Sequence, residues 1–109
     1  MIEKEIGETS VAIMSKKEKF LALARTCAKI LKKKYKVRKI FLIGSLVGGH
    51  FHDESDIDLV VEGLIPESYI TALTELYDIL PIGVELNLIP FEDAFISLKE
   101  KTIKEGMPI

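Results

Sequence analysis

Two short segments of the sequence carry residue types that could do chemistry. Gly44 and Ser45 follow a run of β-branched and aromatic residues, and Asp56 and Asp58 open a second apolar run after ten intervening residues. Side chains alternate along a strand, so the two aspartates would project to one side of it and the apolar residues to the other. Like charges at this spacing repel each other, and fold stability alone gives no reason to pair them. A bound cation would supply the reason.

A third carboxylate, Glu85, lies in a later strand-like run. Apolar residues there alternate with Glu85 and with Asn87, which we interpret as a plain solvent-facing residue. If this strand is the neighbour of the strand that carries the aspartates, Glu85 lies beside Asp56 and Asp58. Carboxylate oxygens are the ligands that Mg²⁺ and Mn²⁺ prefer. We therefore predict that Asp56, Asp58 and Glu85 bind the metal and are the catalytic residues.

The glycine turn fits the same site. A strand that leads through Gly44 into a short helical turn exposes backbone N–H groups to a phosphate, and a Cβ at this position would block close approach. Ser45 can add a hydroxyl donor, so both residues are predicted to bind phosphate. Such a site would hold a nucleoside triphosphate as its metal complex, in position for in-line attack at phosphorus and release of pyrophosphate.

Helices and strands that could position these residues are visible in the sequence. Ser15 and Glu18 form a capping-box pattern before an amphipathic stripe. We expect an α/β (α+β) fold, in which helices flank a small mixed sheet. The predicted order is helix 16–34, strand 37–43, a glycine turn, strand 57–61, helix 66–80, strand 84–89, and a last helix that starts at Phe91 and is ended by Gly106 and Pro108.

Length and composition indicate one globular domain. The chain has 109 residues, of which 48% are hydrophobic and 29% charged. We assign the domain to residues 15–109 and treat residues 1–14 as an arm that is either frayed or an extra strand. A net charge of -2 argues against broad capture of nucleic acid, and no apolar run approaches the length of a membrane span. With no secretory signal pattern at the N-terminus, we expect a cytoplasmic protein.

Several other residues receive structural interpretations. Cys27, the single cysteine, is interpreted as a small buried residue of the first helix. His50 and His52 are interpreted as polar loop residues rather than metal ligands. The basic run at 32–36 is interpreted as a helix end, whose dipole favours cations, rather than as a nucleic-acid patch. Four phenylalanines are assigned to the core: Phe20, Phe41, Phe91 and Phe95.

The spaced motif resembles a known signature. Gly44-Ser45, ten intervening residues and Asp56-Ile-Asp58-Leu59 are similar to the motif of the minimal nucleotidyltransferases, small relatives of the DNA polymerase β superfamily. The resemblance implies a nucleotidyltransferase fold, metal binding by Asp56, Asp58 and Glu85, and phosphate binding by the Gly-Ser turn. Many members are MntA-like antitoxins paired with an all-helical HEPN-domain ribonuclease toxin. Some of them transfer AMP from ATP to a tyrosine of that toxin.

Two functions follow from this resemblance. The first is a magnesium-dependent transfer of a nucleoside monophosphate, AMP from ATP above all, to a hydroxyl acceptor, with a HEPN-domain partner or a second copy of the chain supplying part of the site. The second is an antitoxin that binds and occludes its toxin with weak or no catalysis. Two departures favour the second: Glu85 stands where such proteins most often have Asp, and Gly48 stands where many have Arg.

Overall fold

The structure, a computed structural model, describes residues 15–44 and 56–109. The predicted class and the predicted order of helices and strands are confirmed, while the predicted arm over 1–14 lies outside the described residues. The elements are α2 (Lys16–Lys34), β1 (Lys39–Ile43), β2 (Ile57–Glu62), the 3-10 turn η1 (Pro66–Ser68), α4 (Tyr69–Ile79), β3 (Leu86–Pro90), the 3-10 turn η2 (Phe91–Asp93), α5 (Ile96–Glu105) and β4 (Met107–Pro108).

The strands form one mixed sheet. Their order is β3-β2-β1-β4, with β2 antiparallel to β1 and parallel to β3. Strand β4 was not predicted; it follows Gly106 directly and pairs Met107 with Leu42 and Pro108 with Phe41. A strand of 2 residues has no alternation that a sequence pattern could show, so only the pairing reveals it.

Helix α2 begins and ends as the sequence indicates. The capping box is present, because Glu18 N donates to Ser15 Oγ and Ser15 N donates to Glu18 Oε1, each at 3.1 Å. At the other end, Tyr35 Oη donates to Glu75 Oε1 of α4 at 2.7 Å, and Lys34 Nζ lies 3.0 Å from the same oxygen. The Tyr35 hydrogen bond, followed by that of Lys34, lowers the pKa of Glu75. Part of the basic helix end therefore ties α2 to α4.

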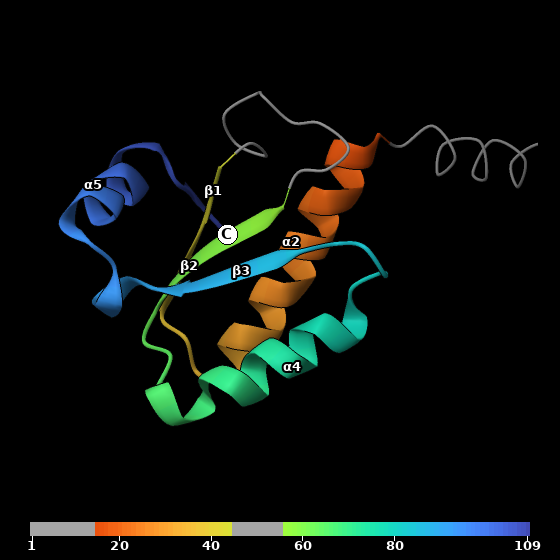
Figure 1. Ribbon diagram of the computed structural model, residues 1–109, viewed down its shortest axis with the longest axis horizontal. Helices are drawn as coiled ribbons and strands as arrows, with labels where there is room; N and C mark the ends of the chain where they lie inside the picture. Colours follow the sequence, from red (N-terminus) through yellow and green to blue (C-terminus); the bar gives the residue numbers. More distant parts are fainter. Residues whose placement is uncertain (1–14, 45–55) are drawn as a thin grey trace, which may run out of the picture.

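The main core lies between the sheet and two helices. Figure 1 shows α2 and α4 along one side of the sheet, with α5 apart from them. Cys27 of α2 is fully buried there, as predicted, and burial raises the pKa of its thiol to about 11. The largest contributors to this core are Leu31, Ile40, Leu42, Ile57, Leu59, Val61, Leu76, Leu86 and Leu88.

The opposite face of the sheet is covered in part by α5. Phe41 of β1 and Val60 of β2 are direct partners on this face, and a Cβ added at Gly106, directly after α5, would lie 3.2 Å from Phe41 Cβ. Phe95 was assigned to the core, but its side chain is 86% exposed. The assignment is wrong because Phe95 is the N-cap of α5 and lies outside the helical stripe that packs on the sheet.

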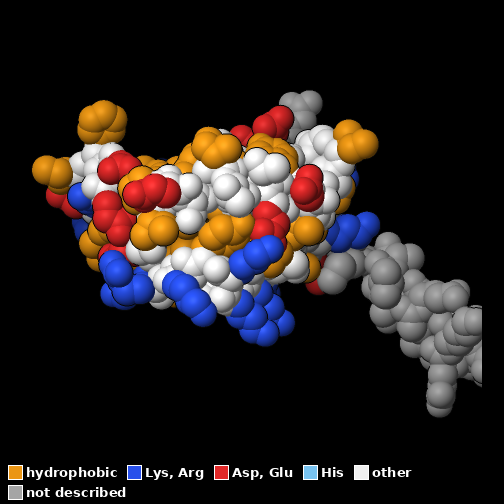
Figure 2. Space-filling model, turned by 90° about the horizontal axis from the view of Figure 1, so that it is seen from below, with side chains coloured by type: hydrophobic (Ala, Val, Ile, Leu, Met, Phe, Trp, Pro, Cys, Tyr) orange, Lys and Arg blue, Asp and Glu red, His pale blue; other side chains and the backbone are white. Residues whose placement is uncertain are grey.

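Charge on the surface is mixed in sign. Figure 2 shows Lys and Arg side chains gathered along one edge of the face in view, while acidic and hydrophobic side chains spread over the rest. This agrees with the small net charge of -2. Across residues 15–44 and 56–109, none of the helices has the length and apolar character that a membrane span requires.

Removal of a core side chain from α4 should lower stability far more than removal of an exposed one. Leu76 is fully buried, whereas Ile70 of the same helix is 68% exposed. We expect Leu76→Ala to lower the free energy of unfolding in urea by about 2–5 kcal/mol, because it leaves a cavity, and Ile70→Ala to lower it by less than about 0.5 kcal/mol. Equal losses would contradict the assigned core.

Candidate active site

Asp56 and Asp58 lie at the start of β2. Ile57 and Leu59 are fully buried in the core, so the alternation of β2 places Asp58 on the face away from α2 and α4, as predicted. Strand β1 ends where β2 begins, with Ile43 opposite Asp58. The turn that follows β1 therefore starts beside the aspartates.

Gly44 is required in this turn for two reasons. Its φ of +87° is one that L side chains rarely adopt, and a Cβ built on it would lie 2.5 Å from Asp58 Oδ2. The absence of a side chain thus leaves the Asp58 carboxylate room beside the backbone. The structure brings Gly44 to the aspartates as the sequence predicts, while the prediction for Ser45, like those for the other residues of 45–55, lies outside the described residues.

Asn87, and not Glu85, faces the aspartates from the neighbouring strand. The parallel register of β2 and β3 sets Asp58 directly opposite Asn87. Asn87 Nδ2 donates to Asp58 Oδ1 at 2.6 Å and to Asp56 Oδ2 at 3.4 Å. Asn87 is solvent-exposed, as interpreted, but it is not a plain surface residue, because its amide bonds to both aspartates. In the sequence, the alternation of Asn87 with Leu86 and Leu88 is the one signal that could have indicated its contact with the aspartates. Glu85 alternates with Leu86 in the same way, so this signal does not distinguish the two residues.

Glu85 is engaged elsewhere. Its Oε2 accepts a hydrogen bond of 3.2 Å from the hydroxyl of Tyr77 on α4, and the same hydroxyl bonds to the backbone N and O of Leu86 at 3.0 and 3.1 Å. Among the residues that the structure describes, no group of three or more His, Cys, Asp or Glu side chains is arranged to hold a metal. The predicted convergence of Glu85 with Asp56 and Asp58 is thus corrected, because Glu85 precedes β3 and its carboxylate bonds to the helix.

The remaining donors fit a divalent cation that arrives with a substrate. Asp56 and Asp58 offer carboxylate oxygens, and the space that a Cβ at position 44 would fill lies against one of them. Mg²⁺ is commonly held by one or two carboxylates together with substrate phosphates, rather than by a complete cage of protein ligands. The pair of aspartates matches this mode of binding.

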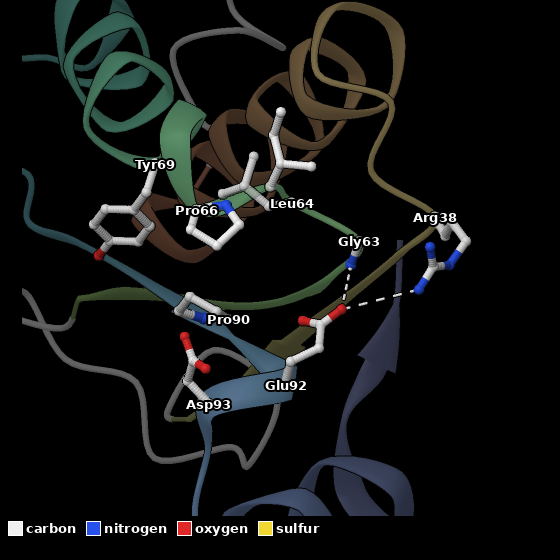
Figure 3. A pocket seen from close by; sticks show the side chains of 9 residues that line it. Arg38, Gly63, Leu64, Pro66, Tyr69, Pro90, Glu92 and Asp93 are labelled. Carbon is white, nitrogen blue, oxygen red and sulfur yellow. Dashed lines mark hydrogen bonds and ion pairs between the residues drawn. The ribbon is translucent and has the colours of Figure 1, made fainter.

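A hollow of about 580 Å³ lies at the other end of the sheet (Figure 3). Asp58 and Gly63 are separated by most of β2, about 16 Å at the usual rise per residue. In the hollow, Glu92 Oε2 accepts from Gly63 N at 2.9 Å and lies 3.9 Å from Arg38 Nη2, while the Tyr69 hydroxyl donates to a carbonyl of β3 at 2.8 Å. Since Arg38, Gly63 and Glu92 bond to one another and Tyr69 bonds to the backbone of β3, we assign the hollow to packing rather than to catalysis.

Taken together, a mixed sheet whose first strand turns at a glycine beside two aspartates of the next strand defines a nucleotidyltransferase. Residues 25–109 match the family described as polymerase beta, nucleotidyltransferase. The chain belongs to this family and is a nucleotidyltransferase, so the resemblance found in the sequence is confirmed.

Individual relatives agree with the family and the fold. The chain is 32% identical over 90 residues to a proposed protein adenylyltransferase of Methanocaldococcus jannaschii, a match that covers 78% of this chain and 88% of the relative. The fold is similar to that of a crystallised toxin–antitoxin with AMP-PNP, at a TM-score of 0.64 and 22% identity over 78% of this chain and 70% of that one. The MntA–HepT toxin–antitoxin gives a TM-score of 0.58 at 18% identity over 81% and 69%.

Substitution of Gly44 should disturb the aspartates beyond the effect of backbone strain. Gly83 provides the matched control, because its φ is +93° but no atom of the described residues lies within 4 Å of an added Cβ. We expect Gly44→Ala and Gly83→Ala each to lose about 1–2 kcal/mol of stability from the positive φ. Only Gly44→Ala should also abolish the rise in melting temperature on addition of Mg-ATP. An equal loss of that rise in Gly83→Ala would contradict a contact between position 44 and the site.

Proposed function

We propose that this chain transfers AMP from ATP to a hydroxyl group of a HEPN-type toxin partner, in a reaction that depends on Mg²⁺ or Mn²⁺. The observation that carries the proposal is the pair Asp56 and Asp58, side by side on the open face of the sheet next to the turn at Gly44. A relative described as a protein adenylyltransferase supports a protein acceptor. Fold neighbours from toxin–antitoxin complexes, one with AMP-PNP, support ATP and the toxin.

In this proposal the residues of the chain bind and orient the reactants. Asp56 and Asp58 would hold the divalent cation, which when bound neutralises phosphate charge and favours attack at phosphorus. Gly44 allows a phosphate to approach the backbone, and the Ser45 hydroxyl donates to it. The acceptor oxygen forms a bond to the α-phosphorus while the bond between this phosphorus and the oxygen that bridges to the β-phosphate breaks. Pyrophosphate leaves, and the proton of the hydroxyl passes to water.

Exposed apolar side chains on and next to α5 support a protein partner. Phe95, Ile96 and Ile103 are 86%, 73% and 69% exposed. Ile96 and Ile103 are seven residues apart and so share one side of the helix. Helix α5 covers part of the sheet face to which Val60 projects. Asp58 lies two residues before Val60 in β2 and so projects to the same face. A partner docked on α5 would therefore lie on the side of the sheet that carries the aspartates.

Transfer should depend on the charge of Asp58. The chain, incubated with α-labelled ATP, Mg²⁺ and its HEPN-type toxin partner, should label that partner. We expect Asp58→Asn to reduce the labelling rate by about 100-fold or more, because loss of even the outer partners of metal ligands costs 10–100-fold. Asp78→Asn, an exposed change on α4, is the control and should label at the wild-type rate. Undiminished labelling by Asp58→Asn would exclude the proposed site.

One observation favours a second function, that of an antitoxin which acts by occlusion. Asn87 leaves the described site with two carboxylates instead of three, which weakens its hold on a metal. Under this alternative, wild type and Asp58→Asn neutralise the toxin equally and neither labels it. Under the first function, neutralisation is lost together with labelling.

Binding of the partner should require the apolar side chains near α5 under either function. We expect Phe95→Ala and Ile103→Ala each to weaken the complex by about tenfold or more, as central apolar anchors of interfaces do. Ile82, fully exposed in the turn between α4 and β3, supplies the matched control, and Ile82→Ala should bind as wild type. Titration calorimetry with the purified partner measures the affinity of each variant. Unchanged affinity in the first two variants would place the interface elsewhere.

A further inference from the structure

The contacts of Asn87 bear on how the site acquires its metal. Asn87 Nδ2 directs its hydrogens to Asp58 Oδ1 at 2.6 Å and to Asp56 Oδ2 at 3.4 Å. These two carboxylates are the groups that would hold a shared cation. In the state seen here, the amide thus occupies donor positions on both aspartates and offsets part of their mutual repulsion.

An amide differs from a carboxylate at this position in two ways. It is neutral, so the site carries two negative charges and not three, and its nitrogen cannot bind a cation. A cation that enters on the side of Asn87 would displace these two hydrogen bonds, and Asn87 would then turn to present its Oδ1 or move away. With two carboxylates alone, the site gains little binding free energy when a free cation replaces these hydrogen bonds, because affinity for hard cations rises with the number of charged ligands. Phosphate oxygens of a bound nucleotide would add the missing charge.

We propose that Asn87 makes metal binding by this site conditional on the nucleotide, so that Asp56 and Asp58 take up the divalent cation only as its complex with a triphosphate. This inference rests on the proposed function. Asn87 is a positioning residue in it, since it acts through the two carboxylates. The proposal assigns Glu85 no part in metal binding, because its carboxylate bonds to Tyr77.

The test is a titration of Mn²⁺ into the purified chain, in which free Mn²⁺ is followed by electron paramagnetic resonance, without nucleotide and with AMP-PNP. Wild type should bind Mn²⁺ alone weakly. Asn87→Asp, which adds one charge at constant shape, should bind Mn²⁺ alone at least about tenfold more tightly. With AMP-PNP present the difference between the two should shrink. Glu85→Gln is the matched control and should behave as wild type in both titrations.

Three outcomes would overturn the proposal: equal affinity of wild type and Asn87→Asp for Mn²⁺ alone, an unchanged difference with AMP-PNP, or a loss of binding in Glu85→Gln. A second measurement covers the case in which three converging charges unfold the metal-free Asn87→Asp chain. Circular dichroism should then show that Mn²⁺ alone restores the fold of this variant, and failure of Mn²⁺ to restore it would count against the proposal.

The failure of this inference and the failure of the proposed function are distinguishable. If Asp58→Asn binds Mn²⁺ and AMP-PNP together as wild type does, the aspartates are not the metal site and both proposals fail. If Asp58→Asn loses that binding but wild type takes up Mn²⁺ alone as tightly as Asn87→Asp, the site stands and only the role of Asn87 fails.

Discussion

The repulsion between Asp56 and Asp58 is the constraint on which the rest of the site depends. The two side chains share one side of a strand whose other side is locked in the core by Ile57 and Leu59, so they cannot turn away from each other by rotating the strand. Their charge must be compensated on the open face. In this structure the Asn87 amide supplies that compensation with hydrogen bonds to both carboxylates, and a cation would supply it more strongly.

The mixed sheet brings the compensating groups to one place. Strand β1 runs antiparallel to β2, so its end lies at the start of β2, and β3 runs parallel to β2, so their starts lie side by side. Gly44, the aspartates and Asn87 therefore meet at the same end of the sheet. At the opposite end the polar groups of Arg38, Gly63 and Glu92 bond to one another, which stabilises the connections there.

The domain divides its two sheet faces between stability and function. Helices α2 and α4 bury the apolar face almost completely, and the Tyr35–Glu75 bond ties these helices together. Among the residues that the structure describes, α5 covers part of the second face, and it exposes Phe95 and Ile103 while its inner side packs on the sheet. The acidic pair and the exposed apolar side chains near α5 therefore lie on the same side of one sheet.

The sequence by itself determined the local structure: the capping box of Ser15 and Glu18, the buried side of β2, and the side on which the aspartates project. Periodicity and capping depend on neighbouring residues, so a sequence displays them. The tertiary structure alone decided which residue of the next strand meets the pair. Glu85 and Asn87 are two residues apart, so strand alternation cannot distinguish them. The register between β2 and β3 pairs Asn87 with Asp58, and the Tyr77 hydroxyl of α4 donates to Glu85 instead.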